Sequence, residues 1–121
     1  MAVRLGLAAA ILVLMEASAI PGCVVRARLI GAIEAKQKKS ESWTRNDRLI
    51  AVATHAQTHD KSQKLSDLRP HLLDEIKEFF VTYNKLRDRK FRANHEASPK
   101  KARKLIDEGM KSFNKKRRKA A

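Results

Sequence analysis

Residues 115–119 form an unbroken run of five cations, Lys-Lys-Arg-Arg-Lys, close to the carboxyl terminus. Such a run can bind nucleic acid or another polyanion, because each neutralised phosphate releases condensed counterions. The like charges also repel one another, and no apolar residue is present around which the run could fold. We therefore expect residues 115–121 to form a disordered basic tail, either solvated without a partner or in contact with nucleic acid.

Other candidate metal ligands and nucleophiles are sparse. His55, His59 and Asp60 could contribute to a metal site, but two histidines in a polar segment are usually surface residues. Cys23 is the only cysteine and lies beside Val24, so we expect a buried and inert thiol. A single cysteine also excludes an intrachain disulfide and a multi-cysteine zinc site.

The positive charge is concentrated in the last third of the chain. The 121 residues include 27 basic and 13 acidic side chains, for a formal net charge of +14. Residues 85–121 hold 15 of the basic and only 4 of the acidic side chains. The hydrophobic content of 43% is typical of a globular domain. The longest apolar run, residues 5–15, is shorter than the roughly 20 residues of a membrane-spanning helix, so we expect no integral membrane protein.

The amino-terminal segment permits two interpretations. Arg4, the apolar residues 5–15 and the small residues Ala17-Ser18-Ala19 together resemble a secretory signal with its cleavage site. The alternative is that residues 10–15 form a buried strand of the domain itself.

Short apolar runs in the first half of the chain predict strands at residues 10–15, 23–33 and 49–53. Residues 35–48 are polar, and we expect them to form a long hairpin loop.

The second half has the periodicity of helices. Apolar residues recur at three- and four-residue steps between Leu72 and Leu86, which predicts an amphipathic helix. A second amphipathic helix is predicted to begin with Ser98 as its cap and Pro99 at its first position, and to continue to Phe113. Strands followed by helices are typical of an α+β domain, with the helices packed on an antiparallel sheet or partial barrel.

Six segments of the chain occur in an order that is characteristic of one protein family. They are Val13-Leu14-Met15-Glu16, residues 20–31, residues 45–52, residues 71–80 with Tyr83, Lys90-Phe91, and residues 104–109. Together they resemble the carboxyl-terminal half of family I soluble inorganic pyrophosphatases, over residues 10–113.

The resemblance implies an α+β fold with a partial OB-like antiparallel β-barrel and two carboxyl-terminal amphipathic helices. It also implies a cytoplasmic protein, magnesium dependence and the hydrolysis of pyrophosphate to two phosphates. The chain would then comprise a truncated domain at residues 1–114, lacking the family's amino-terminal half, and the basic tail.

The resemblance also implies where metal ligands should lie. The family motif Asp-Gly-Asp-Pro-x-Asp precedes the Val-Leu-Met strand, and this chain has Leu5, Leu7 and Ala10 at the aspartate positions. Magnesium requires oxygen ligands, which these side chains lack. Where the family has Asp-x-Lys, this chain has Asn46-Asp47-Arg48, so Asn46 offers an uncharged oxygen and Asp47 is a candidate ligand only if the loop shifts. We therefore expect a metal site that is largely dismantled.

By the same resemblance, four residues are candidates for binding phosphate. Arg48 matches a family lysine and could hold a phosphate bidentately. Tyr83 matches a phosphate-binding tyrosine, Asn84 replaces the adjacent lysine, and Lys90 lies at a further basic position. Alternatively, Tyr83 is a core residue of its helix and Arg48 is merely solvated.

Three functions remain open. The first is an inorganic pyrophosphatase whose activity depends on the missing half. The second is an inactive relative that binds phosphate or pairs, as a homo-oligomer or with a full-length relative, through exposed strand edges. The third is a basic nucleic-acid-binding module, against which we count the expected lack of exposed aromatic side chains on which bases could stack.

Overall fold

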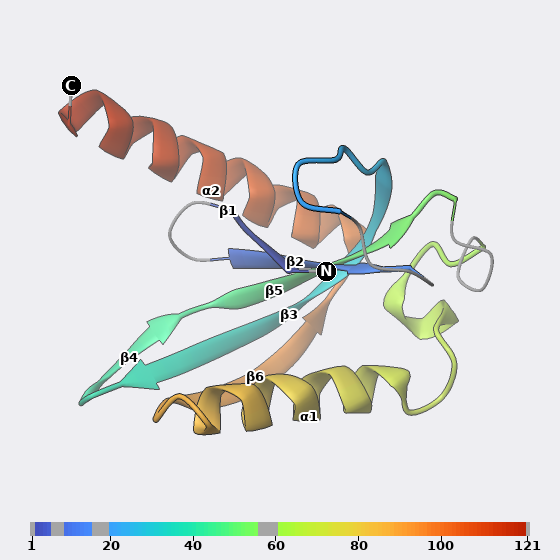
Figure 1. Ribbon diagram of the computed structural model, residues 1–121, viewed down its shortest axis with the longest axis horizontal. Helices are drawn as coiled ribbons and strands as arrows, with labels where there is room; N and C mark the ends of the chain where they lie inside the picture. The colour runs from blue at the N-terminus through green and yellow to red at the C-terminus, as the bar shows by residue number, and fades with distance from the viewer. Residues whose placement is uncertain (1, 6–8, 16–19, 56–60, 121) are drawn as a thin grey trace.

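A computed structural model describes residues 2–5, 9–15, 20–55 and 61–120 of the chain. Strands occupy most of the first half and the two α-helices lie in the second (Figure 1). In chain order the elements are β1 (Ala2–Leu5), β2 (Ala9–Leu14), β3 (Ala27–Lys39), β4 (Ser42–Arg45), β5 (Asp47–Ala53), the 3₁₀ helix η1 (Leu65–Asp67), α1 (Leu72–Lys85), β6 (Lys90–Ala97) and α2 (Pro99–Ala120).

The strands form one mixed sheet in the order β1-β2-β5-β3-β4, and β6 pairs with the second edge of β3. The pairing of β2 with β5 is parallel, whereas every other pairing among the described strands is antiparallel. The predicted α+β class is therefore confirmed. One parallel pair, β2 with β5, lies within the otherwise antiparallel sheet that we expected, and the sheet stays open, as a partial barrel requires.

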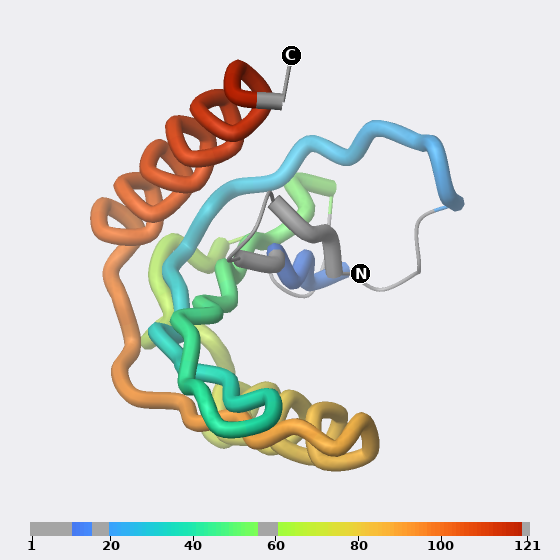
Figure 2. The backbone as a smooth tube through the Cα atoms, turned by 90° about the vertical axis from the view of Figure 1, so that its left-hand side faces the viewer, coloured from blue at the N-terminus to red at the C-terminus, as the bar shows by residue number. Residues whose placement is uncertain are grey.

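The hydrophobic core lies on both faces of the sheet. One face packs against α1, where Ile33 and Ile50 join Ile76, Phe80 and other apolar side chains. On the opposite face, Ala32, Leu49 and Ala97 pack against Ala102 and Leu105 of α2. The two helices accordingly lie on opposite sides of the curved sheet (Figure 2). All seven residues of β5 are buried, because this strand has neighbours on both edges and a helix layer over each face.

Residues 35–48 do not form the long loop that we expected. They complete β3, turn at Ser40 and Glu41, and return as β4 and the start of β5. Ser40 adopts a left-handed conformation (φ 66°), which a tight hairpin turn requires. The strand β6, which we did not predict, pairs with this part of β3 and satisfies its backbone hydrogen bonds. Long-range pairing thus makes strands from a sequence that is locally polar.

The carboxyl-terminal cations are also ordered differently from our expectation. Residues 115–120 continue α2 instead of forming a disordered tail. Lysine and arginine are good helix formers, and cations at the last turn interact favourably with the helix dipole. Cys23 is exposed, because it follows the turn at Pro21 and Gly22 and lies outside the sheet, so our expectation of a buried thiol was wrong. In the described chain, no helix is long and apolar enough to span a membrane.

A glycine is required where β3 passes close to η1 and the end of β6. A Cβ atom on Gly31 would lie 2.6 Å from Leu65 Cγ and 2.7 Å from the carbonyl oxygen of Ala97. The carbonyl belongs to a paired strand and cannot move aside.

We expect Gly31→Ala to lower the free energy of unfolding by about 1–3 kcal/mol, because it overpacks this contact. Gly109→Ala is the matched control, since Gly109 lies inside α2 with no atom within 4 Å of the added Cβ. That change should raise the stability by about 0.5–1 kcal/mol. Urea denaturation measures both, and equal effects of the two substitutions would contradict this account of Gly31.

The η1 segment contains a carboxylate, Asp67, whose pKa is lowered by backbone hydrogen bonds. A hydrogen bond donated by the backbone N–H of Gln63 (2.9 Å) lowers the pKa of Asp67 below its ordinary value, and the N–H of Lys64 (3.2 Å) acts in the same direction. A carboxylate with a lowered pKa in the folded state stabilises the protein above its unfolded pKa, and this stabilisation is lost as the pH falls through the folded pKa.

Asp67→Ala should therefore destabilise the protein most above about pH 5, and the difference from the unmodified chain should shrink as the pH falls below about 4. Asp107→Ala serves as control, because Asp107 is exposed on α2 and accepts no hydrogen bond from any described residue. Thermal denaturation across this pH range gives the comparison. A constant difference at every pH would rule out the ionic origin of the effect.

Candidate functional site

Arg48 is the central polar residue on the α1 face of the sheet. It is 8% exposed, and its Nη1 donates a hydrogen bond to Asn46 Oδ1 at 2.6 Å. Its guanidinium carbon lies 4.9 Å from the ring centre of Phe80 on α1 and 5.2 Å from that of Phe91 on β6. These cation–π contacts fix the plane of the guanidinium. Arg48 is thus a mostly buried cation with a fixed orientation. The alternative interpretation, in which its side chain is merely solvated, is wrong.

Asn46 extends this polar group towards β3. It lies in the break between β4 and β5, where its backbone N–H donates to the carbonyl of Ala35 (2.9 Å). Its side-chain nitrogen donates to Gln37 Oε1, so that Gln37, Asn46 and Arg48 form one hydrogen-bonded series. Sequence reasoning missed Gln37, because β3 and β5 meet only in the folded sheet.

Tyr83 reaches the Arg48 group only through other aromatic rings. Its ring stacks on Phe79 at 5.9 Å, and Phe79 contacts Phe80 edge-on at 5.3 Å. On α1, Tyr83 is 42% exposed, and the guanidinium of Arg87 lies 4.8 Å from its ring centre. Tyr83 is therefore a surface residue at the end of an aromatic series that begins beside Arg48, and not a core residue.

Asn84 does not present its amide to a ligand. It is 2% exposed, and its Nδ2 donates to the carbonyl of Phe80 at 2.7 Å. Its own carbonyl accepts hydrogen bonds from the backbone of Arg87 (3.0 Å) and Arg89 (2.9 Å), which fixes the turn into β6. In place of the phosphate donor we expected, Asn84 has a structural role, because burial against the sheet directs its amide into α1.

Lys90 lies on the other side of the sheet from Arg48. It precedes Phe91 in β6, and the Phe91 ring packs against Phe80 on the α1 side. Successive side chains of a strand point to opposite faces, so Lys90 is on the α2 side. The structure therefore does not bring Lys90 together with Arg48 and Tyr83.

Asp47, the remaining candidate metal ligand, is engaged within the protein. It is 5% exposed, its Oδ1 accepts the backbone N–H of Ala35 (3.1 Å) and its Oδ2 accepts Arg45 Nε (2.6 Å). Arg45 also contacts Glu34 at 3.2 Å. A pocket of about 260 Å³ lies beside these groups, lined by Glu34, Ala35, Lys36, Arg45, Asp47, Asn94, His95 and Lys101.

These residues do not fit a magnesium site. Magnesium is bound by several oxygen ligands in near-octahedral geometry, whereas the charge of Asp47 is already compensated by the Arg45 guanidinium at 2.6 Å, a cation that would repel a metal ion. Within the part of the chain that the structure describes, no three His, Cys, Asp or Glu side chains are placed to hold a metal ion. Leu7, His59 and Asp60 lie outside that part. His55 is exposed in a turn.

We expect Asp47→Ala to lower the free energy of unfolding by about 1–3 kcal/mol or more, because it leaves the buried N–H of Ala35 without its acceptor. The loss should be the same with and without Mg²⁺. Glu78→Ala, an exposed change on α1, should stay within about 0.5 kcal/mol of the unmodified chain. Urea denaturation in both buffers measures this, and a Mg²⁺-dependent stabilisation that disappears in Asp47→Ala would show that Asp47 does bind the metal.

Both the sequence and the fold of this chain are similar to those of known proteins. Residues 8–114 match a family model described as inorganic pyrophosphatase. An inorganic pyrophosphatase of Haloferax volcanii is 38% identical over 76 residues, which are 63% of this chain and 41% of the relative. Another, from Halalkalibacterium halodurans, is 35% identical over 98 residues, or 81% and 58% of the two chains. The structure of the Helicobacter pylori inorganic pyrophosphatase superposes with a TM-score of 0.76 at 28% identity, covering 91% of this chain and 66% of that one. This chain spans about half the length of the curated relatives it matches.

Proposed function

Because the chain belongs to the inorganic pyrophosphatase family, we propose that it binds pyrophosphate or phosphate on the α1 side of its sheet. The observation that carries this proposal is the fixed guanidinium of Arg48, held by Asn46 and lying over two aromatic rings. A guanidinium has five N–H donors in a planar fork that suits phosphate oxygens. Tyr83, exposed at the end of the same aromatic series, is the second proposed contact.

The proposal assigns phosphate recognition to this chain and no step that passes through a metal. A bound magnesium would neutralise phosphate charge and lower the pKa of the attacking water. The described carboxylates do not form a site for it. A cytoplasmic location and pairing with a second copy or a longer relative are further parts of the proposal, whereas hydrolysis of pyrophosphate to two phosphates is not assigned to this chain alone. Pairing is supported by the open sheet, in which β1, β4 and β6 each pair with only one described strand.

Calorimetric titration with pyrophosphate and with phosphate tests the recognition. Arg48→Met should weaken binding by about tenfold or more, because a charge-assisted hydrogen bond is lost. Arg48→Lys, which keeps the charge, should lose less. Tyr83→Phe should weaken binding by about three- to tenfold. Lys111→Gln, in the middle of α2 on the other side of the sheet, is the control and should bind normally.

Circular dichroism first verifies that each variant is folded, and light scattering of the same samples reports pairing. Equal losses in Lys111→Gln and Arg48→Met would show unspecific attraction and contradict the assigned site. We expect no release of phosphate from pyrophosphate in Mg²⁺ above background. Release that falls in Tyr83→Phe would overturn the assignment of recognition without a metal step.

A further inference from the structure

The cross-strand register of β4, β3 and β6 collects cations on one face of the sheet. Lys38 is opposite Trp43 of β4 and Lys90 of β6, and Lys36 is opposite Arg45 and Arg92 in the same two strands. Directly opposed residues of paired strands share a face, and so do residues two apart in one strand. We call this the basic sheet face; its members are Lys36, Lys38, Trp43, Arg45, Lys90 and Arg92.

The basic sheet face is on the α2 side, and α2 reaches only its inner end, where Lys101 lines a pocket with Lys36 and Arg45. Its other members Trp43, Lys90 and Arg92 are exposed. The opposite face of the same strands carries Ala35 and Phe91, which belong to the core under α1. The buried contacts of α2 are with Ala32, Leu49 and Ala97, nearer the middle of the sheet. From there α2 and the β3–β4 hairpin diverge, which leaves the end of the hairpin uncovered (Figure 1).

Most cations of this face have no counter-charge. Arg45 is paired with Glu34 and Asp47, but no described carboxylate lies within 4 Å of the charged groups of the other cations. Like charges directly opposite one another destabilise a sheet. A solvated surface would relieve this repulsion in part, and a bound polyanion would relieve it fully.

The basic sheet face also carries an exposed indole, which distinguishes it from a surface that offers charge alone. Trp43 is 39% exposed and extends across β3, with the guanidinium of Arg92 5.0 Å and the ammonium of Lys38 5.8 Å from its ring. This exposed ring corrects our expectation that the chain lacks aromatic side chains on which bases could stack. Proteins that bind single-stranded nucleic acid combine such aromatic platforms with cations along the phosphate backbone.

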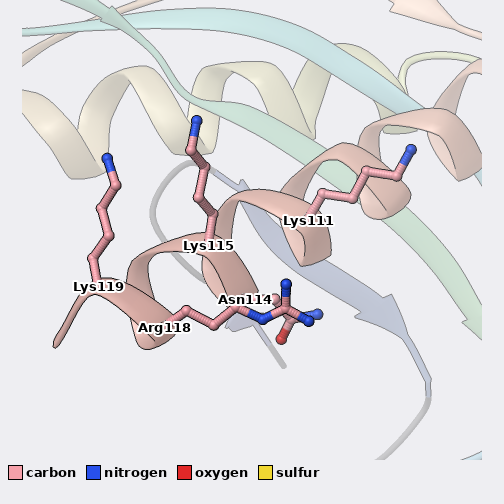
Figure 3. A pocket seen from close by; sticks show the side chains of 5 residues that line it. All are labelled: Lys111, Asn114, Lys115, Arg118 and Lys119. Carbon is pink, nitrogen blue, oxygen red and sulfur yellow. The ribbon is translucent and has the colours of Figure 1, made fainter. Parts of the chain in front are cut away.

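A second basic surface of the chain lacks this combination. The lysines Lys111, Lys115 and Lys119 project from one side of α2, and with Asn114 and Arg118 they line a pocket of about 440 Å³ (Figure 3). No aromatic side chain is among these lining residues. This surface offers charge alone, which makes it a natural comparison for the basic sheet face.

We propose that the basic sheet face binds single-stranded nucleic acid. Trp43 and the Arg92 guanidinium stack on bases, and Lys36, Lys38 and Lys90 contact phosphates. Inorganic polyphosphate has the charge but no π-face, so it would make no use of Trp43. The face lies on the opposite side of the sheet from Arg48, and the proposal is independent of pyrophosphate binding.

The test titrates the full chain with an oligo(dT) of about 16 nucleotides, without Mg²⁺ or pyrophosphate. Trp43 is the only tryptophan, so its fluorescence reports contact with the face directly and should be quenched. Trp43→Leu, followed by anisotropy of a labelled oligonucleotide, should weaken binding by about 5- to 100-fold, the loss of one stacked base.

Two triple variants with equal loss of charge locate the contact. Neutralising Lys36, Lys38 and Lys90 to Gln should weaken binding and reduce the slope of log affinity against log salt by about 2. Neutralising Lys111, Lys115 and Lys119 to Gln should leave the slope nearly unchanged. Circular dichroism verifies that all variants are folded.

Equal effects of the two triple variants, with unchanged Trp43 fluorescence, would overturn the proposal in favour of unspecific attraction. So would an inorganic polyphosphate of matched charge that binds as tightly as the oligonucleotide, if Trp43→Leu had no effect on either.

Discussion

The structure depends on the complete burial of β5. This strand has β2 and β3 on its edges and a helix layer over each of its faces, so every side chain it carries must be satisfied inside the protein. Five of its residues are apolar and meet this demand by packing. The other two residues, Asp47 and Arg48, point to opposite faces and are stabilised by different contacts. The Asp47 carboxylate accepts hydrogen bonds from Ala35 and Arg45. The Arg48 guanidinium lies against aromatic rings.

This constraint also bears on the chemistry of the site. A buried polar group is costly unless it is paired, and a carboxylate whose charge is compensated by a neighbouring cation attracts a metal ion less strongly. Asp47 is paired with the Arg45 cation, whereas the guanidinium of Arg48 is held by Asn46 and two aromatic rings. The phosphate site that we propose therefore rests on Arg48 and not on Asp47.

The long strand β3 links the two surfaces that we propose to be functional. Its side chains alternate between Gln37, which joins the Arg48 group on the α1 side, and Lys36 and Lys38, which belong to the basic sheet face. One strand therefore contributes to two chemically different surfaces on opposite sides of a thin sheet. Successive side chains of a β-strand point to opposite faces of the sheet, and this alternation places the two surfaces on opposite sides.

The sequence by itself determined the α+β class, both helices, three of the strands and the resemblance to inorganic pyrophosphatases. These depend on local periodicity and on motifs that are contiguous in the chain. The tertiary structure alone decided that residues 35–39 and 42–45 are strands and that Asn84 is buried. It also decided that Lys90 lies on the opposite side of the sheet from Arg48. These features arise from the pairing of β3 with β4, β5 and β6, and pairing register is a property of segments up to about sixty residues apart, which no local pattern encodes.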